Sequence, residues 1–138
     1  MRDRDVTYSG KHCTLVIRRL TERVVVVGFT GSDIGEFGDA PFDELAHDLR
    51  ADGSLELFID ARSGVAASMN VSSEWAFWLA RHKASFRHVS MLTGSRFIQL
   101  SAEFVRRFAD MGEVMRLYTD PAGFEGALSN SVANSTPR

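Results

Sequence analysis

Side chains that can bind or react gather just after an apolar segment of the chain. Asp60 ends the apolar run LELFID, and a loop over residues 62–71 leads to two serines that open the aromatic segment SSEWAFWLARHK. A helix over residues 72–83 would present free backbone N–H groups at its first turn, and such groups stabilise a phosphate carried by a nearby hydroxyl. The pattern predicts a partner or ligand site, with Ser72 as the candidate for phosphorylation. Its members are Asp60, Ser63, Ser72, Ser73, Glu74 and Phe77.

The same residues also have a complete structural interpretation. Ser72 is of a type favoured as a helix N-cap, Asp60 can accept hydrogen bonds from loop N–H groups, and Glu74 complements the positive end of a helix. The sequence alone leaves the structural and the functional interpretations open.

Phe77 is the most unusual member of this set. Trp75, Trp78, Leu79 and His82 share one helical stripe, which is enough to bury the helix against a sheet, whereas Phe77 points nearly opposite. Two interpretations follow. Phe77 packs under a neighbouring helix or loop, or it forms an exposed aromatic contact surface for another chain.

The sequence lacks the common motifs for nucleotide binding and hydrolysis. The stretch GFTGSDIGEFG fits neither the dinucleotide fingerprint nor the P-loop, and its acidic residues would repel phosphate. No GxSxG motif is present, and Cys13 has no second cysteine with which to form a disulfide or a zinc site. We therefore expect no metal, no cofactor and no enzymatic activity. An enzyme built from Asp60, His82 and His88 is the weakest alternative.

The composition is that of an ordinary globular domain. The 138 residues are 44% hydrophobic and carry a formal net charge of -2, so one core suffices and nucleic acid is not an expected partner. The arginine pairs at positions 18–19 and 106–107 are expected at solvated edges. A polar start and the lack of an apolar run near ~20 residues indicate a cytoplasmic protein that is neither secreted nor membrane-bound.

Alternating apolar segments predict the elements that hold these residues. We expect strands at 13–17, 23–30, 55–60, 88–92 and 114–118, and helices at 41–53, 72–83, 97–111 and 121–128. The result is a single α/β domain over residues 12–128, with a mixed, mostly parallel five-stranded sheet, an N-terminal β-hairpin and about four helices. Residues 1–11 and 129–138 lack core residues and are expected to be mobile tails.

Helical spacing also predicts which side chains of the helix at 97–111 face the sheet. Apolar residues recur along one stripe of this helix, which we expect to be buried. They are Phe97, Leu100, Phe104, Phe108 and Met111.

Several segments resemble the STAS domain (sulphate transporter and anti-sigma factor antagonist), in the branch similar to the sporulation anti-anti-sigma factor (SpoIIAA-like). Spread over about residues 13–128, they are VVVVGF, LFIDA, SSEWAFWL, VSMLTG and FVRRFADMGEVMRLYTD. In switch-type members of the family, a strand ending in Asp precedes an Asp-Ser-Ser-Gly motif whose first serine is phosphorylated by an anti-sigma factor kinase. Asp60 and Ser72 would match those positions, while Val71 and Glu74 replace the Asp and the Gly of the motif.

The resemblance implies a STAS-like fold and a non-enzymatic regulatory role. It implies a protein partner, either an anti-sigma-type kinase or a second copy of the chain in a homodimer, docked near the start of the helix at 72–83. The alternative is a small apolar-ligand or lipid-binding domain, indicated by ten Phe and two Trp around a long loop that would act as a lid.

Overall fold

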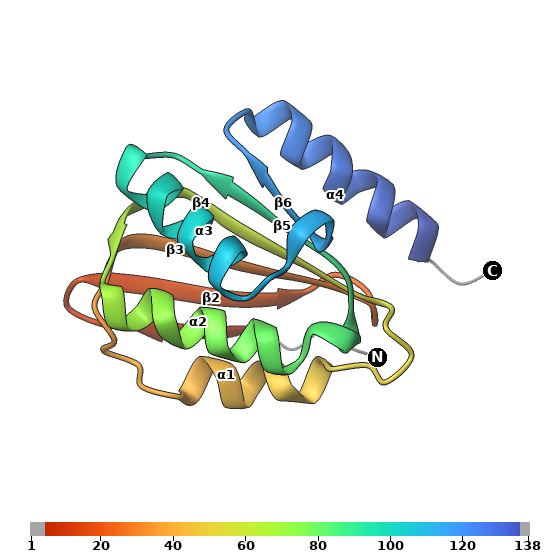
Figure 1. The fold of residues 1–138 in the computed structure, drawn as a ribbon, viewed down its shortest axis with the longest axis horizontal. Coiled ribbons are helices and arrows are strands. Elements are labelled where there is room, and N and C mark those ends of the chain that lie inside the picture. Colours follow the sequence, from red (N-terminus) through yellow and green to blue (C-terminus); the bar gives the residue numbers. More distant parts are fainter. Residues whose placement is uncertain (1–4, 136–138) are drawn as a thin grey trace.

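The computed structural model describes residues 5–135, which form one six-stranded sheet with helices on both faces (Figure 1). The strands are β1 (Val6–Ser9), β2 (Cys13–Arg19), β3 (Val24–Asp33), β4 (Leu55–Ala67), β5 (Phe86–Thr93) and β6 (Met115–Tyr118). The helices are α1 (Ala40–Leu45), α2 (Met69–Arg81), α3 (Arg96–Phe108) and α4 (Pro121–Ser135), with short 3-10 turns at Ala46–Asp48, Lys83–Ser85 and Gly112–Val114.

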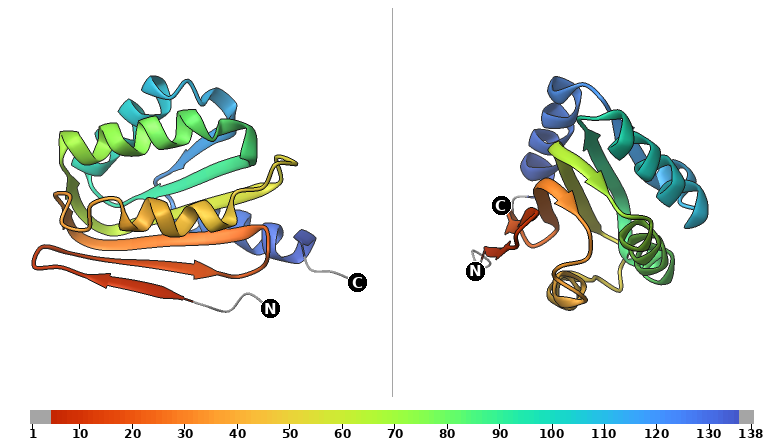
Figure 2. Two further views of the ribbon diagram at one scale, coloured as in Figure 1. Left: turned by 90° about the horizontal axis from the view of Figure 1, so that it is seen from below. Right: turned by 90° about the vertical axis from the view of Figure 1, so that its left-hand side faces the viewer.

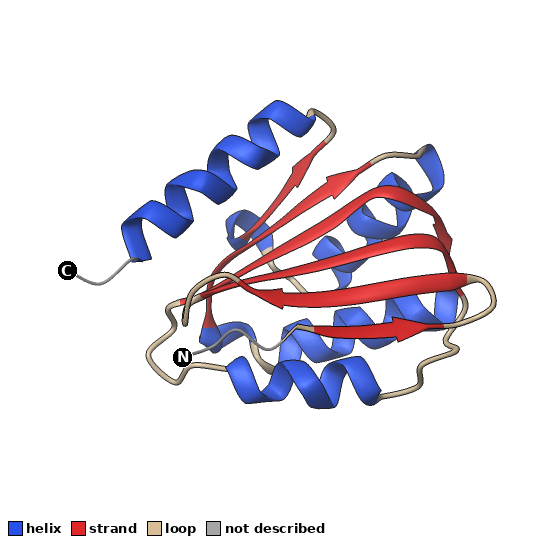
Figure 3. Ribbon diagram, turned by 180° about the vertical axis from the view of Figure 1, so that it is seen from behind, coloured by secondary structure: helices blue, strands red, loops and turns tan. Residues whose placement is uncertain are grey.

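The order of the strands in the sheet follows their order along the chain. β1, β2 and β3 pair antiparallel through short turns, and β3, β4, β5 and β6 pair parallel (Figure 3). Parallel neighbours require crossover connections, and helices α1, α2 and α3 provide them. The predicted mixed, mostly parallel sheet with an N-terminal hairpin is confirmed.

Helices cover the two faces of the sheet unequally (Figure 2). Helices α1, α2 and α3 lie on one face, where Val25 and Val27 of β3 enter the main core. Helix α4 lies on the other face, where Val24 and Val26 pack in a second cluster with Phe124. Because all four valines are buried, the first half of β3 has no side that faces water, and the fold needs a cover on each face.

Regular structure extends into both segments that the sequence predicts to be tails. Residues 6–9 form β1, which pairs with β2, and its Tyr8 packs on Phe37 with ring centroids 5.7 Å apart. At the other end, α4 continues to Ser135, whose hydroxyl lies 2.9 Å from that of Thr21. The sheet therefore has six strands where five are predicted, since β1 is too short and too polar to be recognised. Residues 1–4 and 136–138 lie outside the described residues.

One arginine expected at a solvated edge is buried instead. The Nη2 atom of Arg19 lies 2.7 Å from Oδ2 of Asp48 and 3.0 Å from Oε2 of Glu44. Only 7% of Arg19 is exposed, so its charge is stabilised by these carboxylates rather than by water. The ion pairs join β2 to the end of α1, which stops at Leu45 and continues as a 3-10 turn instead of reaching the predicted residue 53.

The predicted inner face of α3 is wrong. The residues that α3 buries against the sheet are Ile98, Ala102 and Val105. Three members of the predicted stripe, Phe97, Leu100 and Phe108, are exposed; Phe104 is partly buried, and Met111 is buried beyond the helix end. Both stripes have helical spacing, and packing against the sheet selects the one that contains Ile98, Ala102 and Val105.

A pair of truncations tests this assignment of the two faces of α3. We expect Ile98→Ala to lower the free energy of unfolding by about 2–4 kcal/mol, because it removes a fully buried side chain. Leu100→Ala removes an exposed side chain and should change it by less than about 0.5 kcal/mol. Urea unfolding followed by circular dichroism measures both values, and a larger loss for Leu100→Ala would contradict the observed packing.

Candidate functional site

The structure places the predicted site residues on two faces of the sheet. β4 does not end at Asp60 but continues to Ala67, and its added residues pair with the end of β3. Asp60 shares a shallow hollow with Ser63 on the face that α4 partly covers. Ser72 lies across the sheet from them, between the sheet and α2. Alternation along β4 points Ile59 into the main core and Asp60 to the opposite face, whereas α2, which carries Ser72, covers the face of the main core.

Asp60 takes part in local hydrogen bonds. Its Oδ1 accepts from the backbone N of Arg62 at 3.2 Å and from Nε of Arg62 at 3.1 Å. The same guanidinium lies 2.8 Å from Oε2 of Glu125 on α4. Asp60 thus accepts from a backbone N–H group, as its structural interpretation expected, but that group belongs to β4 and not to a loop.

Ser72 is not the N-cap of the aromatic helix. Helix α2 begins at Met69, and the side chain of Ser68 accepts from the backbone N of Val71 at 3.2 Å. Ser72 lies one turn inside the helix and is only 4% exposed. The N-cap prediction is wrong because the helix starts three residues earlier than its aromatic pattern indicates.

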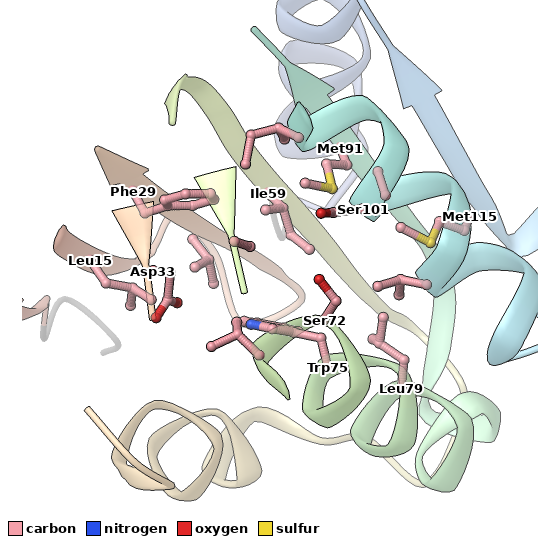
Figure 4. A pocket seen from close by; sticks show the side chains of 16 residues that line it. Leu15, Phe29, Asp33, Ile59, Ser72, Trp75, Leu79, Met91, Ser101 and Met115 are labelled. Atoms are coloured by element: carbon pink, nitrogen blue, oxygen red, sulfur yellow. The ribbon is translucent and has the colours of Figure 1, made fainter. Parts of the chain in front are cut away.

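The Ser72 side chain points into a small cavity between the sheet and helices α2 and α3 (Figure 4). The cavity has a volume of about 50 Å³, and most of its walls are apolar side chains such as Ile59, Trp75 and Met91. Asp33 and Ser101 supply the other polar groups in the wall. A space of this size holds a few atoms, so a larger guest would have to separate α2 from α3.

Asp33 is the one carboxylate in the wall of this cavity. Burial raises the pKa of its carboxyl group, the hydrogen bond donated by Gly35 N at 3.1 Å acts in the opposite direction, and the charge of Glu36 raises it further. The anionic form is therefore less favoured in the folded chain than in the unfolded chain, so the contribution of Asp33 to stability falls as pH rises.

An apolar surface lies on the outer side of α2 and α3. Phe77 of α2 meets Phe108 of α3 edge to face, with ring centroids 5.4 Å apart, and Phe108 stacks on Phe104 at the same distance. We call this the α2–α3 apolar surface. Its members are Met69 and Phe77 of α2, and Phe97, Leu100, Phe104 and Phe108 of α3, all exposed except the partly buried Phe104. Phe77 is therefore exposed, as one of its two interpretations required.

Charged and small residues surround Phe77 on α2. Glu74 and Arg81 are exposed, and within residues 5–135 neither forms an ion pair. Ser73 is partly exposed and Ala80 is exposed. Of the predicted site residues, Ser73, Glu74 and Phe77 thus come together on one accessible face.

A buried polar group that the sequence did not indicate holds α4 on the sheet. Oε1 of Glu56 on β4 lies 3.2 Å from Nε2 of His88 on β5 and accepts a hydrogen bond from the hydroxyl of Ser131 on α4. Burial lowers the pKa of His88, and the nearby charge of Glu56 opposes this shift. The carboxylate stands between the serine and the histidine, so the histidine is not placed to act as a base for that hydroxyl. No motif in the sequence signals contacts between residues so far apart.

Other reactive groups in the described part of the chain are dispersed. Burial raises the pKa of the Cys13 thiol to about 11, with the charges of Asp33 and Glu36 adding to the effect, so the thiol stays protonated at neutral pH. Among residues 5–135, no three His, Cys, Asp or Glu side chains are grouped so as to hold a metal ion. None of the described helices combines the length and apolar character needed to cross a bilayer.

Comparisons with solved structures identify the fold. The chain is similar to an anti-sigma factor antagonist from Mycobacterium paratuberculosis, with a TM-score of 0.56 and 14% identity, covering 88% of this chain and 99% of that one. It is also similar to an uncharacterized protein of the DUF3478 family from Shewanella loihica PV-4, described as having a SpoIIAA-like fold. That match has a TM-score of 0.59 and 14% identity, covering 88% of this chain and 98% of that one. The chain has a SpoIIAA-like fold.

This result confirms the STAS-like α/β domain expected from the sequence segments. No protein-family model matches the chain, and neither does any curated protein. At 14% identity the two structural neighbours share the fold, and a shared fold does not by itself define a functional site.

Substitutions at the two adjacent serines test the burial of Ser72. Ser72→Asp should lower the free energy of unfolding by about 3 kcal/mol or more, because it places an unpaired carboxylate in an apolar cavity. Ser73→Asp is the matched control, since its side chain is partly exposed near the start of a helix, and it should change the value by less than about 1 kcal/mol. Thermal and urea unfolding measure the difference, and equal effects would show that Ser72 is accessible.

Proposed function

We propose that this chain is a cytoplasmic, non-enzymatic regulatory domain that docks a protein partner on the outer side of α2 and α3. The observation that supports the proposal is the α2–α3 apolar surface. Contiguous exposed apolar side chains on a monomer are costly in water and mark interaction sites. Five of the eight large apolar side chains that the described residues leave exposed belong to this surface.

The shared fold supports the class of partner. One structural neighbour is an anti-sigma factor antagonist, so an anti-sigma-type kinase is the partner to test first. Three residues of the predicted site, Ser73, Glu74 and Phe77, belong to the proposed docking surface. It leaves out Asp60 and Ser63, which lie across the sheet.

Phosphorylation of Ser72 would have a structural consequence in this arrangement. The hydroxyl is buried beneath α2, and a phosphate with a charge of about -2 has no room in the cavity. A kinase could modify Ser72 only while the first turns of α2 are open. Modification would therefore change the outer side of α2, where we place the partner.

The test compares partners captured by three forms of the tagged chain from the lysate of its own cells. The wild type should retain a specific protein, which mass spectrometry identifies and inspects for phosphate on Ser72. Phe77→Asp should lose that protein, because a charge at the centre of an apolar contact opposes its burial. Ile34→Asp is the matched control, since Ile34 is exposed but lies outside the surface, and it should retain the partner. Capture that is insensitive to Phe77→Asp would contradict the proposal.

The cavity beneath α2 supports a second candidate, the binding of a small apolar compound. Its walls are mainly apolar, and Ser72 and Ser101 provide hydroxyl groups that can orient a guest. With a volume of about 50 Å³, the cavity fits a fragment rather than a whole lipid.

Native mass spectrometry of the purified chain tests this second candidate. A bound apolar compound should add mass to the wild type and be lost from Ala102→Leu, because the larger side chain fills the cavity from α3. Solvent extraction of the wild type should release the same compound. A wild type with no added mass and an empty extract would contradict ligand binding.

A further inference from the structure

We infer that the occupant of the α2–α3 apolar surface is a second copy of this chain, in a two-fold symmetric dimer whose axis passes beside Phe77. The inference rests on the proposed function, because it names the partner of the same surface. Three properties of the surface favour this occupant: its area, its shape and its charges.

The exposed apolar area approaches what a dimer needs. Phe77, Phe97 and Phe108 are 59%, 70% and 53% exposed, and Met69 and Leu100 are 71% and 54% exposed. An aromatic side chain buries ~150–250 Å² when it is fully covered, so these five residues offer on the order of 600 Å². A standard interface buries about 800 Å² on each partner, and the polar residues around the surface supply the remainder.

The shape of α2 allows a second α2 to approach closely. Ser73 and Ala80 precede and follow Phe77 by about one helical turn, and both are small. When two copies of α2 cross antiparallel at Phe77, each phenyl ring lies over the small residues of the other helix. A two-fold axis makes such a contact self-complementary, so one patch serves both partners.

The charges beside Phe77 match the same antiparallel arrangement. Glu74 precedes Phe77 by three positions and Arg81 follows it by four, so both lie on one side of the helix. An antiparallel two-fold pairing brings Glu74 of one copy next to Arg81 of the other, and the reverse contact forms at the other end. Neither side chain has an ion-pair partner within the described residues, so both are available for this contact.

The charges around the surface are of both signs. Glu74 and Glu103 lie on α2 and α3, and the same helices carry the exposed Arg81, Arg96, Arg106 and Arg107. Arginines beside an apolar surface also suit an anionic membrane, so the specific feature of a second copy is the pairing of Glu74 with Arg81 under a two-fold rotation, and anionic vesicles serve as the competing occupant in the test.

Analytical ultracentrifugation of the full chain over a micromolar to near-millimolar range tests the inference. The wild type and Ile34→Asp should form a dimer, whereas Phe77→Asp should stay monomeric. Dimerisation itself raises the unfolding midpoint, so the midpoints are compared at a concentration low enough for the wild type to be monomeric too. Equal midpoints there show that the substitution acts on the interface and not on the fold, since Phe77 is exposed.

Charge exchange identifies the partner as a second copy in this orientation. Glu74→Arg and Arg81→Glu should each weaken dimerisation about tenfold or more, because each places like charges together twice. The double variant should recover the wild-type affinity. Mixing the two single variants should also give a heterodimer, since every facing pair then has opposite signs.

Several results would overturn the inference. They are a wild type that is monomeric at all concentrations, a dimer that persists in Phe77→Asp, and single charge variants that do not associate on mixing. Cosedimentation with vesicles of anionic phospholipid that depends on Phe77 would overturn it in favour of a lipid. If the wild type is monomeric but the captured protein is still lost with Phe77→Asp, the second copy is excluded and the proposed function stands.

Discussion

The burial of β3 on both sides is the constraint on which this fold depends. Its residues 24–27 are four consecutive valines with almost no exposure to solvent. Since neighbouring side chains of a strand point to opposite faces, a run of this kind needs an apolar cover on each side of the sheet. Helices α1, α2 and α3 form one cover and α4 forms the other (Figure 2).

The two covers are attached by different kinds of interaction. Helices α1 to α3 belong to the crossovers between parallel strands, so the connectivity of the chain itself holds them on their face. Helix α4 follows the last strand, and near its far end the hydroxyl of Ser135 lies 2.9 Å from that of Thr21. The helix is held by Phe124, which packs between Phe58 and Tyr118, and by the hydrogen bond from Ser131 to the buried Glu56.

The apolar content of α3 links the fold to the proposed function. One stripe of this helix, with Ile98 and Val105, is buried against the sheet. A second stripe with equal spacing then has no cover within the described residues, and Phe77 of α2 extends it. Exposed apolar side chains do not stabilise the fold, so they are available to bind a partner.

The sequence by itself determined the α/β class, the mostly parallel sheet and its N-terminal hairpin, and it left the exposure of Phe77 open. These features follow from local periodicity and from alternation along the chain, which neighbouring residues already express. Only the tertiary structure decided which stripe of α3 is buried, that Asp60 and Ser72 lie on opposite faces, and that Ser72 is enclosed. The reason is that two stripes of the same period are equivalent until one meets a neighbouring surface. Likewise, the extension of β4 to Ala67 depends on its pairing with the end of β3, which is distant in the sequence.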